Sequence, residues 1–136
     1  MSIEENKRLV RRQFEELLNK KNYDVIESDM AEDFLDYEMP PHISPGRKGV
    51  KEWMQLVHSV IPDIQATIEN CIAEGDKVVV RNTWRGSHTG LFLGIPPTGK
   101  KFTLKGIVIW RIEKGRIKER WATLDLLGLR QQLQPE

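Results

Sequence analysis

The sequence contains few of the features that mark a metal, disulfide or membrane protein. Its single cysteine, Cys71, excludes an internal disulfide, and no cysteines and histidines are spaced as in a structural zinc site. No apolar run approaches the roughly 20 residues of a membrane-spanning helix. The N-terminal segment is a charged helical pattern and does not resemble a secretion signal. Phosphate-binding loops and nucleophile elbows are also missing from the sequence. We therefore expect a cytoplasmic protein without a metal site.

Net charge is also nearly absent. The 21 basic and 20 acidic residues leave a formal charge of +1, which gives no electrostatic reason to expect nucleic acid or an anionic membrane as a partner. The length of 136 residues fits one domain, residues 1–136, that can bury a core and one pocket within it.

The first half of the chain has a helical period. Ser2 and Glu5 have the spacing of a capping box, and apolar residues recur at helical intervals after them. A shorter amphipathic helix is expected over 23–30, then an extended segment over 34–39. A loop rich in proline and glycine occupies 40–49, and a third helix over 50–61 stops at Pro62.

From Ile64 onward the period changes to the alternation of β-strands. Glu74-Gly75-Asp76 indicates a turn between two strands, and 90–99 reads as a connection rich in glycine and proline. The runs 102–112 and 116–125, joined at Lys114-Gly115, predict a β-hairpin. Helices followed by an antiparallel sheet are typical of an α+β fold in which a curved sheet wraps around the helices.

Asp125 is the first candidate for a catalytic residue. Counting by twos along the last strand places it on the same face as Ile117, Trp121 and Thr123. A carboxylate on an apolar inner face is costly unless it is solvated, partnered or used chemically, so we expect it in a pocket with a raised pKa. The alternative is structural, because an aspartate just before Leu126-Leu127 is a good helix N-cap.

Several strings in the second half resemble the SnoaL-like polyketide cyclase family. They are Gly75-Asp76-Lys77-Val78-Val79-Val80-Arg81, the run Gly86-Ser87-His88-Thr89-Gly90-Leu91-Phe92-Leu93-Gly94-Ile95-Pro96-Pro97-Thr98-Gly99-Lys100, Gly115-Arg116-Ile117 and Asp125-Leu126-Leu127-Gly128-Leu129. The resemblance implies the α+β cone shared with nuclear transport factor two, ketosteroid isomerase and scytalone dehydratase. It also implies ring closure by intramolecular aldol condensation without metal or cofactor, with Asp125 at the position of the family's acid/base.

The sequence offers other site candidates. His88 shares the parity of Asn82 and Trp84, so it could donate a hydrogen bond to a substrate carbonyl, or it could be a structural histidine. Where the family's cyclases often have a polar or basic pocket residue, this chain has Trp110. The expected substrate-binding residues are Trp53, Trp84, Trp110, Trp121, Tyr37 and Asn82, although the tryptophans could equally be ordinary core or lie at a subunit interface.

These observations predict an acid/base enzyme that acts on a small apolar carbonyl compound. Another enzyme on the same cone, such as an epoxide hydrolase, dehydratase or isomerase, is an alternative, and so is a non-catalytic binding or scaffold protein. Ile107, Ile109 and Arg81 alternate with the inward-facing residues of their strands. We therefore expect a homodimer formed through the outer face of the sheet.

Overall fold

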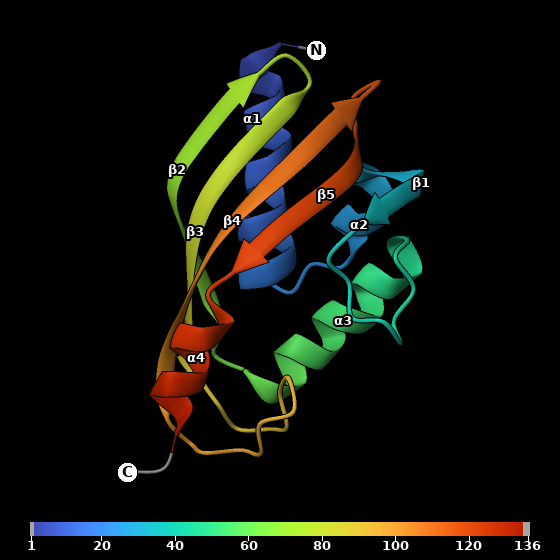
Figure 1. The fold of residues 1–136 in the computed structure, drawn as a ribbon. Helices are drawn as coiled ribbons and strands as arrows, with labels where there is room; N and C mark the ends of the chain where they lie inside the picture. The colour runs from blue at the N-terminus through green and yellow to red at the C-terminus, as the bar shows by residue number, and fades with distance from the viewer. Residues whose placement is uncertain (1, 135–136) are drawn as a thin grey trace.

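The computed structural model describes residues 2–134 and has the expected α+β architecture (Figure 1). In chain order its elements are α1 (Ile3–Arg12), the π-helix η1 (Gln13–Asn19), α2 (Asp24–Asp29), β1 (Met30–Asp36), α3 (Arg47–Val60), β2 (Gln65–Glu74), β3 (Lys77–Ser87), β4 (Lys101–Glu113), β5 (Arg116–Leu124) and α4 (Leu126–Leu133). The five strands form one sheet in the order β1-β5-β4-β3-β2. Only the pair β1 and β5 is parallel, so the sheet is mixed.

The first helix begins where the sequence predicts. The amide of Glu5 donates to Ser2 Oγ at 3.1 Å, which confirms Ser2 as the N-cap. The helix then widens into the π-helix η1, whose last turn includes a bond from the Lys20 amide to the Glu15 carbonyl at 3.2 Å. Such π-helical turns are rare in proteins, and those that occur often lie at functional sites. Within residues 2–134 no helix is long and apolar enough to cross a membrane.

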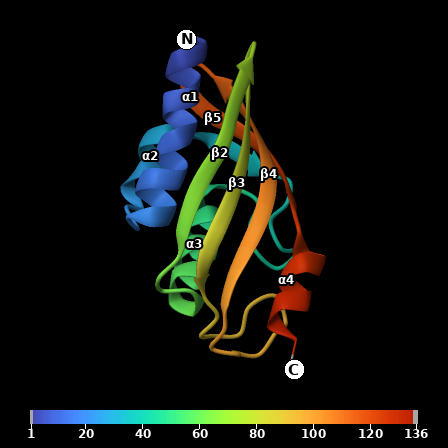
Figure 2. The same ribbon diagram turned by 90° about the vertical axis from the view of Figure 1, so that its left-hand side faces the viewer.

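The helices α1, α2 and α3 lie on one side of the curved sheet, and α4 follows the end of β5 (Figure 2). The helices and the sheet bury a shared apolar core, because each has an apolar face whose removal from water stabilises the fold. Val57 of α3, Val80 of β3 and Leu104 of β4 are at most 1% exposed within this core. The face of the sheet toward the helices is called the inner face below, and the opposite side the outer face.

A β-bulge in β5 changes which residues reach the inner face. Ile112 pairs with Ile117, but the preceding residue Arg111 pairs with Glu119, so Lys118 has no counterpart on β4. An extra residue in one strand reverses the alternation of the side chains beyond it. The inner positions of β5 after the bulge are therefore Arg120, Ala122 and Leu124. The expectation that Trp121 and Asp125 share the inner face with Ile117 is wrong for this reason.

Candidate functional site

The inner face of the sheet and the helices enclose a cavity of about 400 Å³, a size common for small-molecule sites. Its lining comes from η1, β1, α3, the start of α4, the loop after β1, the loop after β3 and the strands β3, β4 and β5. Most of the lining is aromatic or aliphatic: Phe14, Leu17, Leu18, Met30, Phe34, Met39, Pro40, Val50, Trp53, Met54, Trp84, Phe92, Leu93, Trp110, Ala122, Leu124 and Leu126. The polar lining residues are Gln13, Asp36, Glu38, Arg120 and Thr123.

An ion pair of the buried Asp36 with the partly exposed Arg120 lies in the wall of this cavity. The parallel pairing of β1 with β5 sets Asp36 beside Arg120, and Arg120 Nη1 donates to Asp36 Oδ2 at 3.0 Å. The Glu38 amide donates to the other oxygen, Oδ1, at 2.9 Å. Asp36 is 6% exposed, and a carboxylate so buried is tolerated because it is paired and hydrogen-bonded.

Trp110 packs directly against this ion pair. It faces Arg120 across β4 and β5, and the guanidinium carbon lies 5.2 Å from the centroid of the indole ring, within cation–π range. Phe14 of η1 meets the ring edge-on, with centroids 6.0 Å apart. These contacts fix the position of the indole in the cavity wall.

Two buried polar atoms on cavity-lining residues have no hydrogen-bond partner, Trp110 Nε1 and Gln13 Oε1. Gln13 Nε2 donates to Asp29 Oδ2 at 3.3 Å, so the side-chain oxygen is the end of the amide left unpaired. An unsatisfied buried polar group costs about 1 to 3 kcal/mol.

The structure places Asp125 outside the cavity lining. Its side chain is exposed, and Oδ1 accepts from the Gly128 amide at 2.9 Å, so the residue caps α4. The predicted location in an apolar pocket between Trp110 and Trp121 is therefore wrong, and the helix-cap alternative is confirmed. The β5 bulge explains the error, because it moves the odd-numbered residues after Lys118 to the outer face.

His88 and Asn82 are buried but do not line the cavity. His88 Nδ1 accepts from the Thr98 amide at 3.3 Å and lies 3.0 Å from Thr98 Oγ1. Its backbone amide also donates to the carbonyl of Lys100 at 2.9 Å. These bonds join the two ends of the loop between β3 and β4. Asn82 is 2% exposed on the inner side of β3. The expectation that these two residues contact a substrate gains no support from their positions.

The predicted aromatic residues divide between the two faces of the sheet. Trp53, Trp84 and Trp110 line the cavity, as expected, and Trp53 stacks on Phe92 with centroids 5.9 Å apart. Tyr37 and Trp121 do not line it. They stack on each other with ring centroids 5.3 Å apart and an interplanar angle of 17°. The expectation that both contact a substrate gains no support from these positions.

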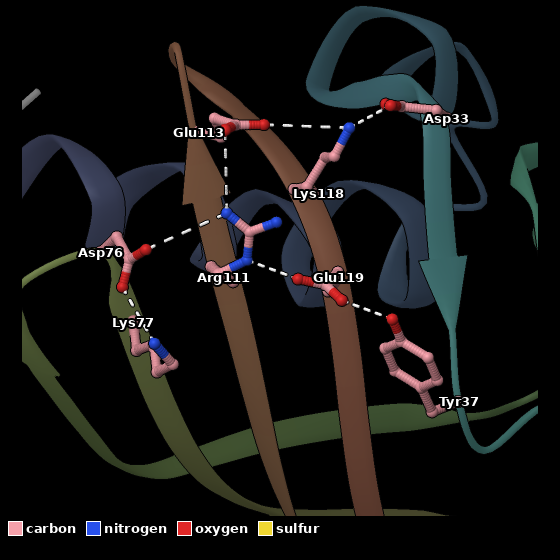
Figure 3. A network of polar contacts seen from close by, with 8 residues as sticks. All are labelled: Asp33, Tyr37, Asp76, Lys77, Arg111, Glu113, Lys118 and Glu119. Carbon is pink, nitrogen blue, oxygen red and sulfur yellow. Dashed lines mark hydrogen bonds and ion pairs between the residues drawn. The ribbon is translucent and has the colours of Figure 1, made fainter.

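Tyr37 belongs to a polar network that runs across β3, β4 and β5 (Figure 3). Its hydroxyl donates to Glu119 Oε2, and Arg111 Nε donates to Glu119 Oε1 at 2.5 Å. The hydrogen bond to Glu119 raises the pKa of Tyr37, and the bonds from Tyr37 and Arg111 lower the pKa of Glu119. The network continues through ion pairs of Arg111 with Asp76 and of Lys118 with Glu113. These charged side chains pair with one another, which gives them a structural role.

Sequence reasoning identified Glu38 as a possible residue of the cavity entrance, but it did not identify Asp36, Arg120 or Gln13 as cavity residues. A signal existed for Asp36, since it shares strand parity with Phe34, which is 1% exposed. No comparable signal existed for Arg120, whose inward position depends on the bulge at Lys118. Among residues 2–134 no three His, Cys, Asp or Glu side chains are arranged to hold a metal ion.

Comparison with known proteins shows similarity over nearly the whole chain. The family model of SnoaL-like polyketide cyclases matches residues 8–133. TsrD from Streptomyces laurentii is similar with 27% identity and a TM-score of 0.89, covering 98% of this chain and 97% of its own. A candidate polyketide cyclase from Bacillus cereus is 28% identical, with a TM-score of 0.81 and coverage of 95% and 80%.

IdmH from Streptomyces antibioticus, also described as a candidate polyketide cyclase, is 27% identical with a TM-score of 0.81, covering 94% of this chain and 97% of its own. No protein with a curated description matches the sequence.

Proposed function

Because the chain belongs to the family of SnoaL-like polyketide cyclases, we propose that it is an acid/base enzyme that closes a ring in a small, largely apolar carbonyl compound. The proposed reaction is an intramolecular aldol-type condensation that uses side chains without a metal or cofactor. The observation that carries the proposal is the ion pair of Asp36 and Arg120 in the wall of a largely apolar cavity. The family and the cavity together imply a small-molecule substrate.

In this mechanism Asp36 is the base. Its carboxylate removes a proton from the carbon next to a substrate carbonyl, and the electron pair moves onto the carbonyl oxygen to form an enolate. Arg120 has further N–H groups beyond the one that binds Asp36, so its charge can stabilise this oxygen. The enolate carbon then attacks a second carbonyl of the same molecule. A carbon–carbon bond forms, and the proton held by Asp36 passes to the new alkoxide.

The apolar lining supports this chemistry in two ways. It excludes water, so the interaction between the enolate and Arg120 is stronger than it would be in solvent. The flat surfaces of Trp53, Trp84 and Trp110 suit a planar or ring-forming molecule and hold its reacting carbons near each other.

The test compares Asp36→Asn with the wild type on a panel of β-keto esters in deuterated water, following exchange of the α-proton and ring closure. The amide keeps the size of the side chain but cannot accept the proton, so we expect a loss of about 10²- to 10⁴-fold in rate. Asp125→Asn is the matched control and should retain the wild-type rate, because its side chain is exposed and caps α4. Equal turnover by Asp36→Asn and wild type would refute the mechanism.

A second candidate function is ligand binding without catalysis. It is favoured by the fact that both oxygens of Asp36 already accept hydrogen bonds, from Arg120 and from the Glu38 amide. Saturable binding of the panel compounds by the wild type, without exchange or ring closure, would support this function instead.

We also propose a homodimer in the cytoplasm, formed through the outer face of the sheet. Ile107 is 50% exposed there, and the neighbouring Ile109 pairs with Trp121 across β4 and β5. These apolar side chains form a surface that a second copy would cover.

A further inference from the structure

We propose that the cavity recognises its substrate through the backbone of β5, in the way that a sheet accepts an additional strand. The substrate then carries an acylamino carbonyl unit, in which an N–H and a C=O flank one carbon atom as in an amino-acid residue. Its carbonyl accepts a hydrogen bond from the Ala122 N–H, and its N–H donates to the Ala122 carbonyl. The proposal rests on the proposed function in one respect, that this cavity is the place where the substrate binds.

The strand β5 continues beyond the end of its neighbour β1 (Figure 1). The register between these two strands ends at Asp36 and Arg120, and the last backbone hydrogen bond runs from the Tyr37 amide to the Arg120 carbonyl at 3.0 Å. Residues 121–124 pair with β4 on one side and have no strand on the other. The side of these residues that is turned away from β4 is called the open edge below.

Ala122 directs its backbone N–H and C=O to the open edge. In an antiparallel pair both groups of one residue point to the same side of the strand, and successive residues alternate. The Asp125 amide donates to the Lys105 carbonyl of β4 at 2.9 Å, whereas the Arg120 carbonyl binds Tyr37 on the opposite side. Ala122 has the parity of Arg120, so its groups also point away from β4. Within residues 2–134 no hydrogen bond to them is found on that side.

The cavity extends to this open edge. Ala122, Thr123 and Leu124 all line it, although the side chains of successive strand residues point to opposite faces of a sheet. A cavity bounded by the inner face alone would not meet Thr123, which pairs with the outward-facing Ile107. Contact with three successive residues therefore places the edge of the strand in the cavity wall. None of the three is buried, so a ligand can reach this part of β5.

The open edge determines which polar unit fits it. It offers one donor and one acceptor side by side, and a chain that offers the same pair in return completes it. An extended acylamino carbonyl unit does so, because its N–H and C=O point to one side. A diketone or an ester without an N–H leaves the Ala122 carbonyl unpaired, and a carboxylate would add a negative charge to a cavity that holds Asp36.

The position of Ala122 connects this contact to the ion pair. Ala122 is two residues, about 7 Å, from Arg120 along the strand. A substrate held at Ala122 by its acylamino unit can therefore extend its remaining carbonyl groups toward Arg120 and its apolar part toward the aromatic lining.

The experiment measures binding by isothermal titration calorimetry with three probes that share a naphthoyl group. Naphthoylglycine methyl ester carries both the N–H and the carbonyl. The corresponding glycolate ester has an oxygen in place of the N–H, and N-(methoxyethyl)naphthamide keeps the N–H but lacks the second carbonyl. We expect the wild type to bind the glycine ester about threefold to tenfold more tightly than either of the other probes, because each lacks one hydrogen bond.

Ala122→Pro removes the N–H at the open edge, where no hydrogen bond to β4 is lost. It should weaken the glycine and glycolate esters by about threefold to tenfold relative to the methoxyethyl amide. Ala122→Val is the matched control, because it changes the side chain and keeps the N–H, so the ratios among the three affinities should stay as in the wild type. Circular dichroism establishes that both variants are folded.

If Ala122→Pro does not fold, hydrogen exchange of the Ala122 amide in the wild type, followed by NMR, replaces it. The glycine ester should slow this exchange more than the methoxyethyl amide does. Equal affinities of the wild type for the three probes, equal weakening of all three by Ala122→Pro, or equal effects on the exchange would overturn the proposal. Failure of the glycine ester to bind would also overturn it.

These outcomes are separable from those for the proposed function. Discrimination among the probes that depends on the Ala122 N–H, without turnover of β-keto esters, would leave the backbone contact standing and refute the enzyme. Turnover that depends on Asp36, together with probes that bind without discrimination, would do the reverse.

Discussion

At the scale of single residues, two aspartates near β-strand ends have opposite surroundings. Asp36 at the end of β1 is buried against Arg120 in the cavity wall, whereas Asp125 after β5 is exposed and binds the first turn of α4. Uninterrupted strand alternation would predict that both aspartates lie on the inner face. Their difference comes from the partner strand, which sets Arg120 beside Asp36 and leaves Asp125 beyond the cavity.

The capping role of Asp125 predicts a specific pattern of stability. Asp125→Asn should be nearly neutral, because asparagine and aspartate cap helices about equally well, whereas Asp125→Ala should lower the free energy of unfolding by about 1 kcal/mol. Urea unfolding followed by circular dichroism measures both values. An unchanged stability for Asp125→Ala would contradict the cap.

His58 predicts how stability depends on pH. It is 7% exposed, its Nε2 donates to the Leu18 carbonyl at 2.8 Å and its Nδ1 lies 2.5 Å from the Tyr23 hydroxyl. Burial lowers the pKa of His58. The unfolded chain therefore takes up a proton near pH 6.5 that the folded protein resists, and stability should fall as pH drops below about 6.5, by at most about 1.4 kcal/mol per pH unit.

Urea unfolding between pH 7 and pH 5 tests this dependence, with His58→Gln as the comparison. The variant should lack the part of the slope that His58 contributes, although its stability at neutral pH will be lower. A slope of the same size in both proteins would assign the pH dependence to other groups.

At the scale of elements, the bulge in β5 determines which side chains reach the cavity. Lys118 is the extra residue of the bulge, so deleting it would leave the pairs Ile112–Ile117, Arg111–Glu119 and Trp110–Arg120 in regular succession, with Arg120 still on the inner face. The ion pair of Arg120 with Asp36 would be kept, so we expect the deletion to lower the free energy of unfolding little more than loss of the Lys118 side chain does.

Lys118→Ala is the matched control for the deletion. It removes the contacts of Lys118 with Asp33 and Glu113 but keeps the bulge residue in the backbone. These partners are exposed, and a surface ion pair contributes about 0 to 1 kcal/mol. Urea unfolding should therefore show a small loss for Lys118→Ala and a similarly small one for the deletion. A large loss for the deletion alone would show that the bulged backbone itself stabilises the sheet.

At the scale of the whole molecule, the outer face of the sheet predicts the oligomeric state. Sedimentation velocity at micromolar concentration should show a dimer, and Ile107→Glu should shift it to a monomer, because the charge would be buried at the interface. Leu91→Glu is the control, since Leu91 is 62% exposed in the loop after β3 and does not belong to a strand of the sheet. A wild-type monomer would contradict the proposed dimer.

The sequence by itself determined the features that depend on neighbouring residues. Ser2 predicted the start of α1, the Lys114-Gly115 turn predicted the β4–β5 hairpin, and the change of period after Pro62 predicted the α+β fold. Both turn residues have positive φ, 51° and 77°, which is the conformation that such a hairpin turn requires. These signals are local, so they can be read from one stretch of chain.

Tertiary structure alone decided the composition of the cavity. The bulge at Lys118 exists only in relation to β4, and it sends Arg120 inward and Trp121 outward. Likewise Asp36 becomes a cavity residue with a partner because β1 pairs in parallel with β5, 84 residues away. The strand pattern assumes uninterrupted alternation, and one extra residue reverses it without leaving a mark in the local sequence. The physical reason is that alternation along one strand predicts side-chain direction only where pairing with the neighbouring strand is regular. That pairing depends on residues far away in the sequence.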